Sequence, residues 1–172
     1  MFLVVLLGAS MVASAANPVV DGANMVEHAI ENCRSAAGRD VDRLTLHSLL
    51  LLEIVHGVPE RYRGMSLAAA CRESGFSRDA VGDGGKAIGW FQMHPWWERY
   101  GVDRRDPIDA GNAWIGRIAK NTRRARRKGC SRPWLAAWAY VASGPKGWRC
   151  RSPRHWALLR KWRWQLCRRG FC

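Results

Sequence analysis

One glutamate, Glu73, stands where an alanine-rich stretch ends and a glycine-rich loop begins, in the string CRESGFSRDAVGDGGKAIGWFQ of residues 71–92. Leu67 and Ala70 precede it at helical spacing, and Gly75 is placed to end the helix. Glu73 is therefore expected in the last turn of a buried helix. The partial negative charge of a helix C-terminus and an apolar environment both favour the protonated form of a carboxyl group. A carboxylic acid that keeps its proton is what general acid cleavage of a glycosidic bond requires.

The simplest alternative for Glu73 is an exposed side chain paired with Arg72 or Arg78. A second acid in the same string, Asp83, raises a different question about the reaction. If Asp83 lies about 6.5–9.5 Å from Glu73 across the substrate, the pair can place a water molecule for hydrolysis. If it points into solvent, it is a turn residue, because Asp followed by two glycines favours a turn.

The spacing around Glu73 forms a pattern that continues downstream. Its residues are Glu73, Ser74, Phe76, Ala80, Ala87, Gly89, Gln92 and Pro95, followed by Asp106, Pro107, Asn112, Gly116 and the string AWAYVASGP. This pattern resembles the signature of the soluble lytic transglycosylase family, whose fold is like that of goose-type lysozyme. The resemblance covers roughly residues 42–165. It implies a lysozyme-like helical domain that cleaves peptidoglycan.

The resemblance implies a role for each matching residue. Glu73 matches the single catalytic acid, which protonates the oxygen between N-acetylmuramic acid and N-acetylglucosamine and then acts as a base to give a 1,6-anhydro product. Ser74, Gly89 and Gln92 match positions of the sugar site, and Tyr140 matches an aromatic hydroxyl near the acid. Asp83 stands at a spacing that resembles an acid of goose-type lysozymes, which hydrolyse the same bond.

Two positions depart from the family pattern. Val141 stands where the family commonly has Asn, and His94 stands where it often has Met, so the sugar contacts are less defined than the acid. A lone His beside Pro95 is expected to form part of the groove wall rather than to act as a base or a metal ligand. No metal or cofactor is expected.

Six of the ten tryptophans fall into two groups by position. Trp90, Trp96 and Trp97 flank the signature and are candidates for stacking on sugar rings, with Trp96 or Trp97 as the expected contact. Trp114, Trp134 and Trp138 lie on helical segments and are expected to fill the core.

The composition fits an exported protein with an anionic partner. The chain has 172 residues and a formal charge of +14, which suits nucleic acid, anionic lipid or the acidic polymers of a bacterial envelope. Residues 1–16 are apolar and end in small residues, as in a secretory signal peptide. The six cysteines contain no CxxC pair and predict disulfides, with Cys130–Cys150 as the first pairing expected. The expected location is secreted or periplasmic.

Helical periodicity predominates along the chain, and no stretch shows sustained strand alternation. We expect a mainly α domain, stapled by disulfides, with a small hairpin around residues 82–92 and an N-cap at Asp42 or Thr45. The domain expected for catalysis is 42–152, preceded by an N-terminal extension at 17–41.

The C-terminal segment 153–172 is a cationic amphipathic helix in this interpretation. It either adsorbs to an anionic envelope lipid or polymer, or docks its apolar face on the domain. The chain is expected to be a monomer. Three hypotheses follow for its function: a peptidoglycan-cleaving enzyme, a non-catalytic cationic protein that binds wall or membrane, and a nucleic-acid-binding protein. Export and the lack of a nucleic-acid motif argue against the third.

Overall fold

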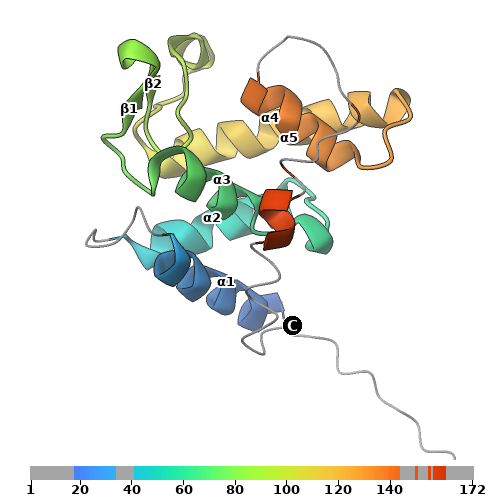
Figure 1. Cartoon of the computed structure of the whole chain (residues 1–172), viewed down its shortest axis with the longest axis horizontal. Helices are drawn as coiled ribbons and strands as arrows, with labels where there is room; N and C mark the ends of the chain where they lie inside the picture. The colour runs from blue at the N-terminus through green and yellow to red at the C-terminus, as the bar shows by residue number, and fades with distance from the viewer. Residues whose placement is uncertain (1–17, 34–40, 144–149, 151–154, 156, 162–172) are drawn as a thin grey trace, which may run out of the picture.

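The computed structural model describes residues 18–33, 41–143, 150, 155 and 157–161, and these are mainly helical with one small sheet, as expected (Figure 1). The α-helices are α1 (Pro18–Asn32), α2 (Arg43–Val55), α3 (Met65–Ser74), α4 (Pro107–Arg127) and α5 (Pro133–Ser143). The short 3-10 helices are η2 (Glu60–Tyr62), η3 (Asp83–Gly85) and η4 (Pro95–Tyr100), and the strands are β1 (Val81–Gly82) and β2 (Ala87–Ile88).

Helix α2 begins at Asp42, one of the two N-caps predicted. The Asp42 carboxylate accepts hydrogen bonds from the backbone N–H groups of Leu44 and Thr45, both at 3.0 Å, and from the Thr45 hydroxyl at 2.6 Å. These bonds satisfy N–H groups that have no partner inside the helix. Leu46 and Leu49, one turn apart, are fully buried and direct α2 into the core.

Helix α3 runs through the middle of the core and ends where the sequence predicts. Gly75 is the C-cap, with a φ of 59°, and its N–H donates to the Cys71 carbonyl at 2.9 Å. Leu67 and Ala70 are fully buried. The C-terminal turn of α3, which carries Glu73, emerges from the core at the side occupied by the hairpin (Figure 1).

Helix α4 crosses the molecule between the hairpin and α5 and packs on both α2 and α5 (Figure 1). Gly111 permits the close approach to α2, because a Cβ at this position would overlap the Leu49 side chain. The prediction of a tryptophan core is confirmed: Trp114, Trp134 and Trp138 are all buried. Trp114 and Trp138 meet edge to face, with ring centroids 5.9 Å apart.

The predicted hairpin is present and short. β1 and β2 pair antiparallel, with Val81 opposite Ile88 and Gly82 opposite Ala87. The turn between them is formed by η3, where Asp83 has a φ of 48°. The turn chemistry of an Asp followed by glycines therefore operates here as predicted.

Two disulfides are formed within the described part of the chain. Cys130–Cys150, the pairing predicted, closes the connection around α5, and Cys33–Cys71 ties the end of α1 to α3. Disulfides persist mainly in oxidising compartments, which agrees with export. Cys167 and Cys172 lie outside the described residues.

The two segments that flank the expected domain pack into its core. Val26 and Ala29 of α1, in the segment interpreted as an N-terminal extension, are fully buried. Near the C-terminus, Leu159 is also fully buried, and the His155 ring lies 5.0 Å from that of Trp138, so the described part of the segment docks on the domain. The signal segment 1–16 lies outside the described residues. Where the chain is described, no helix has both the length and the apolarity needed to cross a membrane.

Candidate functional site

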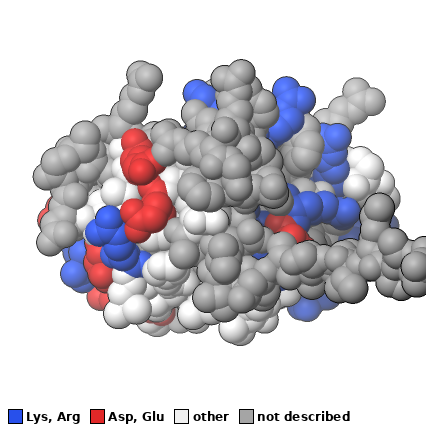
Figure 2. Space-filling view, turned by 90° about the horizontal axis from the view of Figure 1, so that it is seen from below, with Lys and Arg blue, Asp and Glu red and all other residues white. Residues whose placement is uncertain are grey.

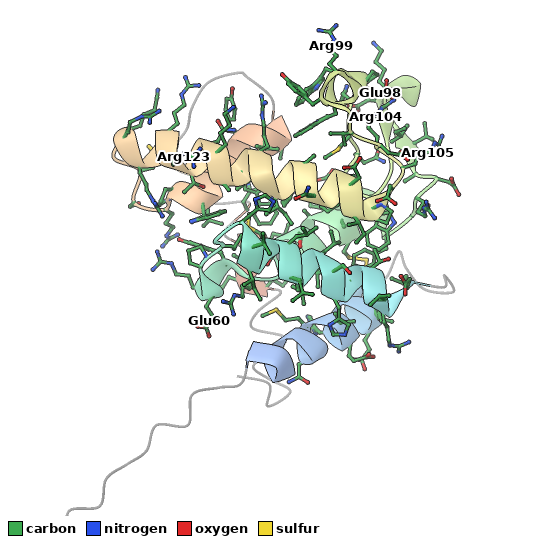
Figure 3. All side chains as sticks on the ribbon, turned by 180° about the vertical axis from the view of Figure 1, so that it is seen from behind. Glu60, Glu98, Arg99, Arg104, Arg105 and Arg123 are labelled. Atoms are coloured by element: carbon green, nitrogen blue, oxygen red, sulfur yellow. A yellow bond between two sulfur atoms is a disulfide. The ribbon has the colours of Figure 1, made fainter. Side chains whose placement is uncertain are left out.

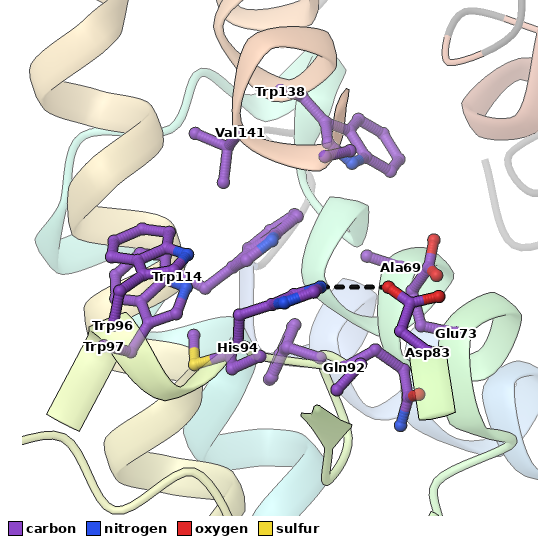
Figure 4. A pocket seen from close by; sticks show the side chains of 14 residues that line it. Ala69, Glu73, Asp83, Gln92, His94, Trp96, Trp97, Trp114, Trp138 and Val141 are labelled. Carbon is purple, nitrogen blue, oxygen red and sulfur yellow. Dashed lines mark hydrogen bonds and ion pairs between the residues drawn. The ribbon is translucent and has the colours of Figure 1, made fainter. Parts of the chain in front are cut away.

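A groove of about 520 Å³ opens between the hairpin side of the molecule and α5, and Glu73 lies in it (Figure 4). α3 and α5 line it from one side, and the hairpin, η4 and α4 line the rest. The lining residues are Ala69, Glu73, Asp83, Ala87, Phe91, Gln92, Met93, His94, Trp96, Trp97, Trp114, Trp138, Val141 and Ala142.

Glu73 reaches the groove from the last turn of α3, as predicted, but the apolar environment expected around its side chain is not found. Its side chain is 38% exposed, and its carboxylate lies 3.7 Å from the Arg72 guanidinium. The helix body is buried, whereas its final turn projects into an open groove that water can enter. The exposed ion pair considered as the alternative is therefore present, although its Glu73 member lines the groove.

Ser74, the next residue, holds the hairpin against α3. Its hydroxyl lies 3.0 Å from the carbonyl oxygens of both Ala70 and Trp90 and can donate to one of them at a time. Ser74 does not line the groove in this structure. Its observed contacts fix the position of the segment that follows β2.

Gly89 and Gln92 shape the same segment. Gly89 has a φ of 74°, and a Cβ there would overlap the backbone carbonyl of Arg104. The Gln92 amide nitrogen donates to the carbonyls of Ala80 at 3.2 Å and Gly89 at 3.0 Å. Gln92 also lines the groove, whereas Gly89 does not. Gly89 and Gln92 therefore both stabilise the backbone of the hairpin.

Asp83 and His94 form a pair within the groove. The His94 Nε2 lies 3.0 Å from the Asp83 Oδ2, and the Asp83 side chain is 69% exposed (Figure 4). This contact joins the turn of the hairpin to the residue that precedes η4. Asp83 does not point away from the groove, which was the condition for its being a turn residue alone. Glu73 and Asp83 thus place two carboxylates in the same groove.

Two stacked tryptophans form the wall farthest from Glu73 in Figure 4. The rings of Trp96 and Trp97 have centroids 4.3 Å apart and an interplanar angle of 24°. Trp96 is 39% exposed and Trp97 is buried. The Arg117 guanidinium lies 5.3 Å from the Trp96 centroid and 5.8 Å from that of Trp97. An aromatic face is thus held rigidly at the groove.

The wall contributed by α5 differs from what the resemblance implies. Trp138 and Val141 line the groove, whereas Tyr140 is half-buried and is not among the lining residues. Trp114, from α4, also lines the groove, with its ring centroid 5.1 Å from that of Phe91. The groove is therefore more aromatic than predicted, because Trp114 and Trp138 belong to the core and also line the groove.

Arg104 organises the loops of the groove and was not identified from the sequence. Its side chain is 10% exposed, and it donates to the Glu98 carboxylate at 2.6 Å and to the carbonyls of Lys86 and Met93 at 2.9 and 2.8 Å (Figure 3). These bonds tie η4 to the hairpin. An Arg within a string of charged residues gives no sequence signal for such a contact.

A second acid missed by sequence reasoning, Glu53, supports the helix that carries Glu73. Glu53 is fully buried at the end of α2, and its carboxylate accepts from the Gly64 N–H at 2.7 Å and from the Ser66 N–H and hydroxyl at 2.6 Å. It therefore caps the start of α3 from another helix. Burial raises the pKa of Glu53 to about 7, against the opposing effect of these hydrogen bonds.

No group of three His, Cys, Asp or Glu side chains within the described ranges is arranged to hold a metal ion. Comparisons of the chain with protein families, with curated proteins and with solved structures find no match.

Proposed function

We propose that the chain cleaves the β-1,4 glycosidic bond between N-acetylmuramic acid and N-acetylglucosamine in peptidoglycan, as a secreted or periplasmic lytic transglycosylase with a lysozyme-like fold. The observation that carries the proposal is the position of Glu73, which presents a carboxyl group inside an aromatic-lined groove. The resemblance of the signature around Glu73, the two disulfides and the charge of +14 support it.

The reaction requires one group to act twice. Protonated Glu73 donates its proton to the bridging oxygen, the bond from the muramyl C1 to that oxygen breaks, and N-acetylglucosamine leaves as an alcohol. The Glu73 carboxylate then accepts the proton of the muramyl C6 hydroxyl as O6 bonds to C1, which gives the 1,6-anhydro product and regenerates the acid. No other reactant is consumed.

Because Glu73 is exposed in the groove, the substrate must supply part of the shielding of its carboxyl group from water. A glycan strand stacked on Trp96 would displace water from the groove and cover the carboxyl group. The apolar surroundings that favour a protonated acid are then completed by the substrate together with Trp138. Free protein and complex therefore differ in how far the Glu73 carboxyl group is shielded from water.

A second candidate, hydrolysis of the same bond, is favoured by the Asp83–His94 pair. Asp83 lines the same groove as Glu73, and His94 holds its carboxylate at 3.0 Å. In this reaction Glu73 again protonates the leaving oxygen, while Asp83 takes a proton from a water molecule that bonds to C1. The product then has a reducing end and no anhydro ring.

Digestion of purified sacculi, followed by mass analysis of the released fragments, tests both candidates. Anhydro ends support the transglycosylase, and reducing ends support the hydrolase. Absence of soluble product from the wild-type protein contradicts both and favours a cationic binding protein. Asp83→Asn should leave anhydro formation intact and should abolish the formation of reducing ends.

Glu73→Gln is the decisive variant for either reaction. It removes the proton donor while keeping the size of the side chain, so turnover should be lost with little change in the free energy of unfolding. Glu60→Gln is the matched control, because Glu60 is exposed on η2 and does not line the groove. Retained turnover in Glu73→Gln would remove the residue from its role.

A further inference from the structure

A row of cations runs along one face of α4, starting at the groove. We call it the α4 row, and its members are Arg117, Lys120 and Arg124 of the helix and Lys128, its C-cap residue. At 100° per residue, these side chains fall within an arc of about 80° on the helix. Arg117 is half-buried and the other members are exposed. Because the sequence has no acid between Arg117 and Lys128, the arc has a single sign of charge.

The α4 row is continuous with the wall of the groove. Arg117 lies over Trp96 and Trp97, which both line the groove, and Trp114 lines it one turn before Arg117 on the same helix. From Arg117 the row continues for roughly 16 Å toward the C-terminal end of α4, at 1.5 Å per residue. Figure 3 shows α4 from its outer side, with Arg123 toward this end.

This continuity indicates what kind of anion the row receives. We infer that the α4 row binds the carboxylates of the peptide stems that branch from a glycan strand held in the groove. The inference rests on the proposed function, since it needs the strand in the groove. A peptide stem leaves the sugar at the groove and carries its carboxylates outward, which matches a row that begins at the sugar-stacking wall and extends away from it.

The competing explanation is that the net charge of the protein alone drives its binding to the wall. Seen from below the view of Figure 1, basic side chains also gather toward one end of the molecule (Figure 2). If net charge drives binding, any exposed cation contributes equally, and position on α4 has no effect. Arg126 provides the comparison, because it is exposed on the same helix but lies about 160° around the axis from Arg124.

The experiment measures binding of the full chain to insoluble sacculi at neutral pH and low salt. Glu73→Gln is the common background, so that the sacculi are not digested, and binding is measured both before and after removal of the phosphate-containing wall polymers. Lys120→Glu and Arg124→Glu test the row, and Arg126→Glu is the control with the same change of charge. A second preparation consists of glycan strands from which an amidase has removed the peptides.

Each row variant should weaken binding to peptide-bearing sacculi by about three- to tenfold, as expected for the reversal of one exposed charge contact. Arg126→Glu should weaken it less than twofold. On peptide-free strands, the row variants and the control should bind alike. If Arg124→Glu does not fold, Lys120→Glu decides the outcome.

Three results would overturn the inference. These are equal losses for row and control variants, a loss that persists on peptide-free strands, and a loss that appears only while phosphate-containing polymers are attached. The first indicates net charge, the second a contact with the sugars, and the third a different anion. The proposed function fails by a separate measurement, the analysis of released fragments, so the two failures can be told apart.

Discussion

The buried carboxyl group of Glu53 should make the stability of this protein fall as pH rises. Burial raises the pKa of Glu53 from its ordinary value of 4.5 to about 7, so the folded state binds the proton more tightly than the unfolded state does. The stabilisation is therefore complete below pH 4.5 and is lost as the pH rises through about 7. At about 1.4 kcal/mol for each pH unit between the two pKa values, the loss amounts to about 3 kcal/mol.

Glu53→Gln tests this directly, because the amide has no proton to release in this range. At pH 4.5 the variant should be less stable by about 1–3 kcal/mol, since the amide nitrogen cannot accept the Gly64 N–H that now bonds to Oε2. Between pH 4.5 and 8, the wild type should lose about 3 kcal/mol more than the variant does. At alkaline pH the two proteins should therefore approach the same stability.

Urea unfolding with the disulfides intact, followed by circular dichroism at a series of pH values, gives both curves. Glu60→Gln is the control for the loss of one exposed carboxylate, and its curve should run parallel to the wild type. Parallel curves for wild type and Glu53→Gln would refute the reasoning. They would mean that the hydrogen bonds from Ser66 and Gly64 fully offset the cost of burying the charge.

Other changes test the packing that holds the groove together. Gly89→Ala should lower the free energy of unfolding by about 3 kcal/mol or more, because strain at positive φ is combined with overlap on the Arg104 carbonyl. Gly101→Ala, at the same φ of 74° with open space around it, should lower it by only about 1 kcal/mol, and urea unfolding of both variants measures the difference. Replacing Cys33 and Cys71 by Ser should lower the unfolding free energy by about 4 kcal/mol, given the separation of 38 residues, and a loss below about 1 kcal/mol would show that the cross-link constrains little. Asp42→Ala should cost about 1 kcal/mol through loss of the N-cap of α2, which thermal unfolding can detect, with Asp79→Ala as an exposed control.

Local signals in the sequence were sufficient to predict the start of α2, the end of α3 and the hairpin turn. Asp42 caps its helix through residues two and three positions away, and Gly75 ends α3 through a bond to the preceding turn. The hairpin turn at Asp83 likewise depends on adjacent residues. Cys130–Cys150 was predictable because the two cysteines flank a single helix, whereas the partner of Cys33 is 38 residues away.

The groove was only partly predictable, because its geometry depends on contacts between distant segments. Periodicity identified α3 as buried, but it could not show that the last turn leaves the core, so it favoured an apolar environment for Glu73 over the exposed alternative. Asp83 and His94 were singled out separately, and their pairing depends on how the hairpin folds back. Glu53 was hidden in a strongly apolar helix, where nothing in the neighbouring residues indicates that its partners are Gly64 and Ser66.

The motif around Glu73 joins the acid to the rest of the groove through backbone contacts. Ser74 connects α3 to the Trp90 carbonyl, and Gly89 and Gln92 hold the turn that carries Asp83. Substitutions at Gly89 or Gln92 should therefore reduce activity and stability together, because they displace the hairpin. Glu73→Gln should reduce activity alone. If Gln92→Ala lowered turnover without lowering the unfolding free energy, Gln92 would contact the sugar directly, and its hydrogen bonds to Ala80 and Gly89 would be incidental to its role.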